Sequence, residues 1–126
     1  MSDPLSLRQC EFTSALARLI QAAERLGFQV KVQELNRTFE TQQEYVAKGV
    51  SKTMDSRHLD KLAADIVLFK NGVLVEDHEA YRPLGVFWEQ QGGRWGGRFG
   101  LEHEPPEVQD KKLGWDSPHF ELRRLA

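Results

Sequence analysis

The sequence has little of what marks several common protein classes. It has one cysteine in 126 residues, so it can form neither an internal disulfide nor a cysteine-rich zinc site. Its net charge of −2 lacks the basic excess that nucleic-acid-binding surfaces need. No apolar run approaches the roughly 20 residues of a membrane-spanning helix. The first residues lack the basic and apolar segments of a signal peptide. We therefore expect no nucleic-acid partner, no stable membrane insertion and no signal peptide.

The length favours a single domain, residues 1–126, and the apolar periodicity predicts a mixture of helices and strands. Helices are expected at residues 6–26, 37–45 and 81–91, and strands at residues 28–33, 63–69, 73–75 and 115–122. The first helix should end at Gly27, and Asn71-Gly72 predicts a tight hairpin. We predict an α+β fold in which a small antiparallel sheet packs against two or three helices.

Three local features carry further expectations. Cys10 lies in the first predicted helix, and we expect a small buried thiol rather than a nucleophile. Residues 92–100 alternate glycines with aromatic and basic residues, which predicts a backbone that passes close to another part of the protein. No phosphate-binding or dinucleotide-binding pattern is present there. Residues 101–114 are charged and contain Pro105-Pro106, which predicts a long loop.

Two short segments contain the side chains that are best suited to bind a metal ion or to catalyse a reaction. Asp65 interrupts a strongly apolar strand, and a buried carboxylate without a partner costs several kcal/mol, so a cation or metal is expected beside it. Together His58, Asp65 and His119 would give zinc two nitrogens and one oxygen, with the fourth position left for water. Asp116 lies three residues before His119 and could take the proton of that water.

The residue types alone leave a structural interpretation open. Isolated histidines in proteins are most often structural, and the spacing of His58 and Asp65 also arises by chance. His78 and His103 lie in charged segments and are expected at the surface, although either could replace His119 as a ligand. Arg37 lies at a predicted strand-to-helix junction, where it could point into a cleft or form a surface salt bridge.

Four motifs, in order, are similar to those of the D-Ala-D-Ala carboxypeptidase family of zinc peptidases, and most of all to its phage L-alanyl-D-glutamate endopeptidases. The similarity covers residues 34–122. The motifs are Arg-Thr-x-x-x-Gln from Arg37 to Gln42, Ser-x-His from Ser56 to His58, Ala-x-Asp from Ala63 to Asp65, and Asp-x-x-His-Phe-Glu from Asp116 to Glu121.

The resemblance implies a role for each matched residue. His58, Asp65 and His119 would bind Zn²⁺, and Asp116 would be the catalytic base. Arg37 would polarise the scissile carbonyl and stabilise the oxyanion.

Five further residues are expected to bind or surround the substrate. Ser56 would hydrogen-bond a ligand or the substrate, and Gln42 belongs to the motif that carries the catalytic arginine. Trp95 and Trp115 would wall the groove. Arg98 stands where many relatives carry an acidic residue, and it could bind a terminal carboxylate.

The function implied is zinc-dependent cleavage of the L-alanyl-D-glutamate bond in the stem peptides of bacterial peptidoglycan, as in a bacteriolytic phage endolysin. A D-Ala-D-Ala carboxypeptidase or dipeptidase, and a non-enzymatic phage binding module, are the alternatives. We expect a monomer made in the host cytoplasm that acts on the cell wall after release. A separate cell-wall-binding domain is not expected.

Overall fold

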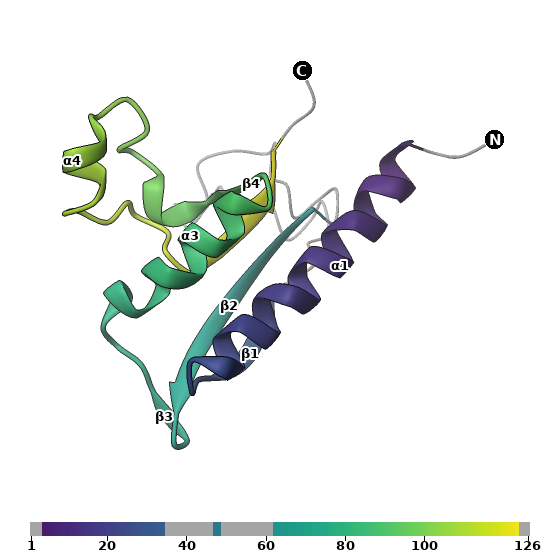
Figure 1. Ribbon diagram of the computed structural model, residues 1–126, viewed down its shortest axis with the longest axis horizontal. Coiled ribbons are helices and arrows are strands. Elements are labelled where there is room, and N and C mark those ends of the chain that lie inside the picture. Colours follow the sequence, from purple (N-terminus) through teal and green to yellow (C-terminus); the bar gives the residue numbers. More distant parts are fainter. Residues whose placement is uncertain (1–3, 35–46, 49–61, 124–126) are drawn as a thin grey trace.

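The computed structural model describes residues 4–34, 47–48 and 62–123 (Figure 1). The helices are α1 (Pro4–Arg25), α3 (Arg82–Gln90) and α4 (Pro106–Gln109), with short 3-10 helices η1 (His78–Tyr81) and η2 (Gly96–Arg98). The strands are β1 (Gln29–Glu34), β2 (Ala63–Lys70), β3 (Val73–Leu74), β4 (Gly93–Trp95) and β5 (His119–Leu122). The predicted helix at residues 37–45 lies outside the described residues.

The strands form one antiparallel sheet in the order β1-β2-β5-β4, and β3 pairs with the end of β2. β2 is the central element because it pairs with β1, β3 and β5. Its pairing with β5 places Asp65 directly opposite His119 and Ala63 opposite Glu121. β4 pairs with the other edge of β5, where Arg94 lies opposite Glu121. The predicted α+β class with an antiparallel sheet is confirmed.

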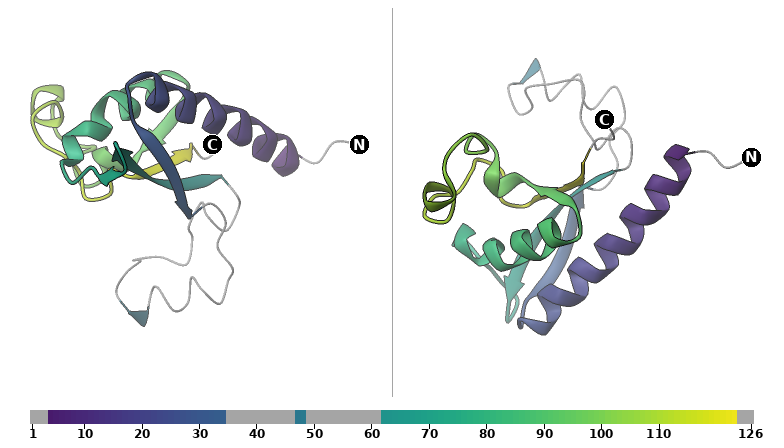
Figure 2. Two further views of the ribbon diagram at one scale, coloured as in Figure 1. Left: turned by 90° about the horizontal axis from the view of Figure 1, so that it is seen from below. Right: turned by 45° about the horizontal axis from the view of Figure 1, so that its top comes forward.

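The two faces of the sheet have different environments. Side chains alternate between the faces of a strand, so Phe120 and Leu122 point one way while His119 and Glu121 point the other. α1 and α3 both lie on the face that carries Phe120 (Figure 2). The face with His119 is turned away from these two helices.

The core lies between the sheet and the two helices. Trp88 of α3 is at its centre, with its ring 5.9 Å from those of Phe12 and Phe120 in edge-to-face contacts. Fully burying a large apolar side chain stabilises a fold by roughly 1.5–3 kcal/mol, and several residues make such a contribution. Those with no exposed surface include Leu19, Ala23, Ala64, Ile66, Leu68, Leu84, Trp88, Trp95 and Phe120.

Most of the predicted boundaries agree with the structure. α1 ends just before Gly27, whose φ of 93° gives the left-handed stop that was expected. Asn71 and Gly72 have φ values of 51° and 77°, as in a two-residue hairpin turn with both central residues left-handed. The last strand is shorter than predicted, because Trp115 to Pro118 form the loop that leads into β5.

The predicted burial of Cys10 was wrong, and the geometry of the helix gives the reason. The core stripe of α1 contains Phe12 and Leu16, and Cys10, two residues before Phe12, is rotated by about 200° around the helix. Cys10 is accordingly exposed. Val86 stands in the same relation to the buried Leu84 on α3, and 39% of its surface is exposed.

The glycine-rich segment does pass close to other parts of the protein, as predicted, but it also contains the unpredicted strand β4. A Cβ atom added to Gly85 or Gly97 would collide with the ring of Trp95, and one added to Gly93 would collide with Trp88. The glycines therefore allow two buried indoles to lie flat against the backbone. The following loop is partly ordered by α4, and Arg82 donates hydrogen bonds to the carbonyls of Gln109 and Lys112.

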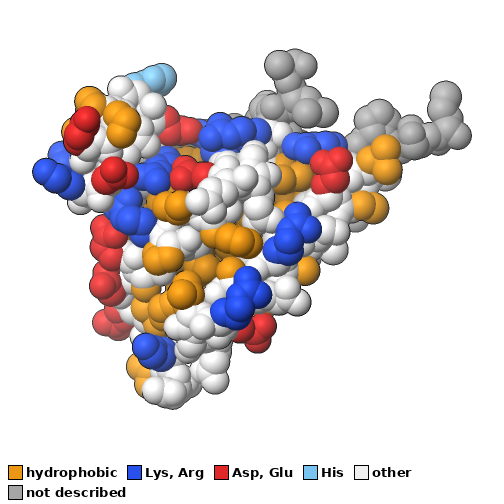
Figure 3. Space-filling model, viewed as in Figure 1, with side chains coloured by type: hydrophobic (Ala, Val, Ile, Leu, Met, Phe, Trp, Pro, Cys, Tyr) orange, Lys and Arg blue, Asp and Glu red, His pale blue; other side chains and the backbone are white. Residues whose placement is uncertain are grey.

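The face of the molecule that α1 and α3 form carries both basic and acidic side chains (Figure 3). None of the described helices is long and apolar enough to cross a membrane.

Candidate metal centre

Three potential metal ligands converge near the start of β2 and the start of β5. Asp65, Asp116 and His119 each offer one donor atom, and these atoms lie within 4.8 Å of one another. The His119 Nδ1 atom lies 3.0 Å from Asp65 Oδ1 and 3.9 Å from Asp116 Oδ2. The contact with Asp65 follows from the pairing of β2 with β5, which places Asp65 opposite His119. The contact with Asp116 follows from the loop that leads into β5. Two carboxylates and one imidazole thus surround a single point.

Backbone contacts hold the loop that carries Asp116. The Asp116 N–H donates to the Gly96 carbonyl at 3.2 Å, and the His119 N–H donates to the Asp116 carbonyl at 3.0 Å. A Cβ atom at Gly96 would collide with that same Asp116 carbonyl and approach the side chain of His119. Glycine at position 96 therefore lets the loop close over the sheet and brings Asp116 to His119.

The environment of His119 favours a cation. The residue is 7% exposed, and its ring is surrounded by carboxylates. Burial opposes protonation, but the hydrogen bonds with Asp65 and Glu121 outweigh it and raise the pKa of His119 to about 9. The site thus stabilises positive charge, whether it comes from a proton or from a bound metal ion.

The donor set fits zinc. Imidazole nitrogen and carboxylate oxygen are both common zinc ligands, and catalytic zinc sites use three protein ligands. Asp65 is 26% exposed and Asp116 is 34% exposed in their side chains, so a solvent molecule or substrate can reach the cluster. The chemistry that such an arrangement supports is metal-assisted hydrolysis with a carboxylate as base.

Glu121 is a site residue to which the sequence analysis assigned no role. Its Oε1 lies 2.8 Å from His119 Nε2, on the side of the imidazole opposite Asp65. The signal was present in the sequence, because residues 119 and 121 of a strand must share one face. The spacing of His119 and Glu121 in the Asp-x-x-His-Phe-Glu motif therefore places the two side chains together.

Four of the predicted site residues cannot be placed. His58, Arg37, Gln42 and Ser56 lie outside the described residues, so the structure does not test their roles. The described part of the chain brings together Asp65, Asp116 and His119.

The aromatic residues predicted to wall the groove have different positions. Trp115 is 63% exposed and packs against Phe99, whose ring centre is 5.1 Å away. The Phe99 ring is in turn 5.4 Å from that of His119, so Trp115 and Phe99 border the cluster. Trp95 is fully buried and donates from Nε1 to the Ser117 carbonyl at 2.7 Å. Trp95 thus supports the Asp116 loop from beneath.

Arg98 makes contacts within the protein. Its guanidinium donates to both carboxylate oxygens of Glu89 at 3.1 Å and to the Gln109 carbonyl at 3.1 Å. The side chain is 14% exposed. In this arrangement Arg98 joins α3 to the loop that follows η2.

His78 and His103 are exposed, as predicted. His78 Nδ1 lies 2.9 Å from the hydroxyl of Ser117, next to the cluster but not in it. Neither residue belongs to the group of potential ligands found in the described chain.

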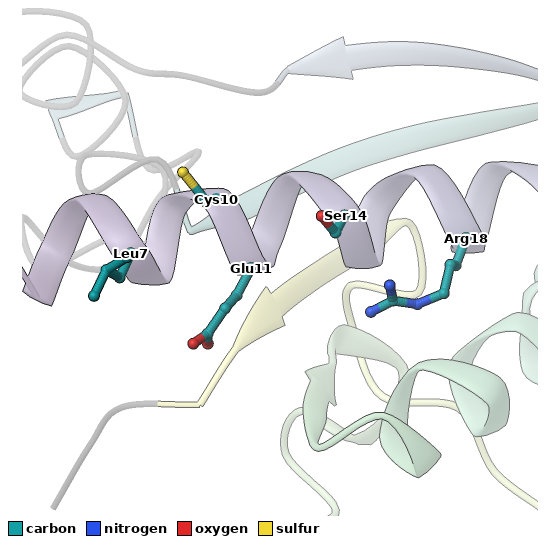
Figure 4. Close-up of a pocket in the computed structure, with 5 residues that line it drawn as sticks. All are labelled: Leu7, Cys10, Glu11, Ser14 and Arg18. Atoms are coloured by element: carbon teal, nitrogen blue, oxygen red, sulfur yellow. The ribbon is translucent and has the colours of Figure 1, made fainter.

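A shallow pocket lies elsewhere, along the exposed side of α1 (Figure 4). All five side chains that line it come from that helix: Leu7, Cys10, Glu11, Ser14 and Arg18. Cys10 points away from Glu11 and Arg18 in this view. The pocket shares no residue with the metal cluster.

Solved structures with the same fold include an endopeptidase and a D,D-pentapeptidase. The chain is 30% identical to the L-Ala D-Glu endopeptidase ChiX of Serratia marcescens, with a TM-score of 0.60 over 86% of this chain and 77% of ChiX. A zinc complex of the vancomycin-resistance D,D-pentapeptidase VanY is 23% identical, with a TM-score of 0.58 over 89% and 70% of the two chains. VanYB in complex with D-alanine-D-alanine is 24% identical, with a TM-score of 0.56 over 89% and 69%. At these identities the VanY structures show the shared fold alone.

No curated protein sequence matches the chain. Residues 7–123, however, match the family described as phage L-alanyl-D-glutamate peptidase. This match spans nearly the whole chain, from the first turns of α1 to the end of β5. On this evidence the chain belongs to the phage L-alanyl-D-glutamate peptidase family.

Proposed function

We propose that the chain is a zinc-dependent endopeptidase that cleaves the bond between L-alanine and D-glutamate in peptidoglycan stem peptides. The observation that carries this proposal is the convergence of Asp65, Asp116 and His119 on the face of the sheet turned away from α1 and α3. Membership of a peptidase family with this specificity supports the choice of substrate. ChiX, a structural relative named for the same bond, supports it further.

The proposed ligands are His58, Asp65 and His119. Zinc bound by these residues would polarise a water molecule and lower its pKa toward about 7. Asp116 would take the proton of the attacking water and return it to the departing amine of D-glutamate. Its side chain is half-buried, and the distance of 3.9 Å between its Oδ2 and His119 Nδ1 supports this role. Arg37 would stabilise the oxyanion that develops on the alanine carbonyl.

The substrate would lie along the exposed aromatic border of the cluster. Trp115 offers a large exposed ring beside Phe99 and is the best placed of the predicted wall residues. Ser56 and Gln42 are proposed to hydrogen-bond the peptide or a ligand. Trp95 and Arg98 would act indirectly, by holding the Asp116 loop and the segment after η2.

The chemical test is digestion of purified peptidoglycan by the zinc-loaded protein, followed by mass spectrometry of the new amino termini. His119→Ala is the matched inactive control. New D-glutamate amino termini that are absent with the variant would support the proposal. Release of D-alanine would indicate a carboxypeptidase instead, and zinc binding without any cleavage would indicate a binding module.

We further propose that the protein is a monomeric catalytic unit made in the host cytoplasm and released to the wall late in infection. The phage family supports this setting, and the common core of α1, α3 and the sheet supports a single unit. Bacteria that express the protein should lyse only after their inner membrane is permeabilised. Lysis without permeabilisation would contradict the proposed dependence on release, and a dimer in sedimentation analysis would contradict the monomer.

A further inference from the structure

Glu121 is a buried carboxylate for which the proposed reaction has no step. It is 7% exposed, and its side chain lies on the face of β5 that carries His119. Burying a carboxylate is costly unless hydrogen bonds and a nearby cation compensate. Its Oε1 lies 2.8 Å from His119 Nε2, and Arg94 Nη1 lies 3.9 Å from the same oxygen. The carboxylate therefore lies between the imidazole and a guanidinium.

The two nitrogens of His119 face different partners. Nε2 faces Glu121, whereas Nδ1 faces Asp65 and Asp116. A neutral imidazole has one N–H and one lone pair, and an ionised carboxylate can only accept a hydrogen bond. Both nitrogens face a carboxylate, so the metal-free ring can donate from each of them. A metal ion held between Asp65 and Nδ1 would displace the Nδ1 proton, and the hydrogen bond to Glu121 would then keep the remaining proton on Nε2.

Glu121 is itself held in place. Its backbone carbonyl accepts a hydrogen bond at 2.8 Å from Nε1 of the buried Trp88. Across the sheet it is paired with Arg94, whose guanidinium also bonds Glu102 and lies 4.3 Å from the centre of the Phe99 ring. These contacts fix both the backbone and the charged neighbour of the carboxylate.

We infer that Glu121 is a positioning residue for the metal centre. By accepting the Nε2–H hydrogen bond, Glu121 selects the tautomer and ring orientation in which Nδ1 of His119 binds the metal. Arg94 in turn helps to hold the Glu121 carboxylate in place. This inference rests on the proposed metal site. Carboxylates that orient ligating histidines in this way commonly change metal affinity by about 10- to 100-fold when they are removed.

The first test measures zinc affinity by competition with a chromophoric chelator. Glu121→Ala should weaken zinc binding by about 10- to 100-fold. Glu121→Gln should show a smaller loss, because its amide oxygen can still accept from Nε2–H but carries no charge. Glu107→Gln is the matched control, because it removes an exposed carboxylate on α4 that belongs neither to the cluster nor to its support, and it should leave the affinity unchanged. Wild-type affinity in a folded Glu121→Ala variant would overturn the inference.

A second test needs no variant and so does not depend on whether Glu121→Ala folds. Long-range ¹H–¹⁵N NMR spectra of the zinc-loaded wild-type protein report which nitrogen of His119 carries the proton. We expect a protonated Nε2 and a metal-bound Nδ1, and a protonated Nδ1 would overturn the assignment. Peptidoglycan cleavage is measured separately, so zinc-dependent cleavage with unchanged affinity in Glu121→Ala would refute only the role of Glu121.

Discussion

Removal of bound metal by a chelator should leave a protein whose stability falls as the pH rises from 6.5 to about 9. The cause is His119, whose pKa is raised from 6.5 to about 9 in the folded state despite its burial. A raised pKa means that the folded state holds the proton more tightly than the unfolded state does. The contribution is therefore complete below pH 6.5 and disappears as the pH passes through 9.

The expected magnitude follows from the size of the shift. One pKa unit corresponds to about 1.4 kcal/mol, so the rise from 6.5 to about 9 corresponds to about 3–4 kcal/mol in the free energy of unfolding. Hydrogen bonds from the imidazolium to Asp65 and Glu121 are its structural origin. Urea unfolding followed by circular dichroism at intervals between pH 6 and 9.5 measures it.

His119→Gln provides the control, because glutamine is polar but cannot take up a proton. The stability of the wild-type protein should fall relative to this variant throughout the same pH range. Parallel curves for the two proteins would refute the reasoning. An NMR titration that gave His119 a pKa near 6.5 would refute it as well.

Three substitutions test how the site is supported. Gly96→Ala should lower both stability, by about 1–3 kcal/mol, and zinc affinity, because the new methyl group collides with the Asp116 carbonyl; unchanged zinc binding in titrations would contradict this. Trp95→Phe should cost about 1–3 kcal/mol in urea unfolding, because the buried Ser117 carbonyl loses its donor; a loss below about 0.5 kcal/mol would argue against that role. Trp115→Ala should raise the KM for peptidoglycan fragments and leave the melting temperature almost unchanged, since the side chain is 63% exposed. An unaltered KM would remove Trp115 from the substrate groove.

The parts of the fold that local sequence determines were predictable. The hairpin after β2 follows from Asn71-Gly72, whose residues tolerate left-handed backbone angles. β1 and β2 follow from their apolar patterns, and Asp65 was conspicuous as a carboxylate within one of them. β4 was not predicted, because a three-residue strand that begins with glycine has no clear alternation.

The parts that depend on tertiary contacts were only partly predictable. The glycine-rich segment suggested a close approach, but the sequence does not say that Gly96 closes against the Asp116 loop. Cys10 was placed in the correct helix but on the wrong side of it. The role of Glu121 depends on which nitrogen of His119 it faces, and only the three-dimensional arrangement gives that information.

The central claim is that Asp65 and His119 hold the metal while Asp116 moves the proton. Zinc content and peptidoglycan cleavage, measured together on Asp116→Asn and Asp65→Asn, test it most directly. We predict that Asp116→Asn retains its zinc but loses about 100- to 10,000-fold in cleavage rate, whereas Asp65→Asn loses the zinc itself. Cleavage at the wild-type rate by zinc-loaded Asp116→Asn, or full zinc binding by Asp65→Asn, would contradict the account.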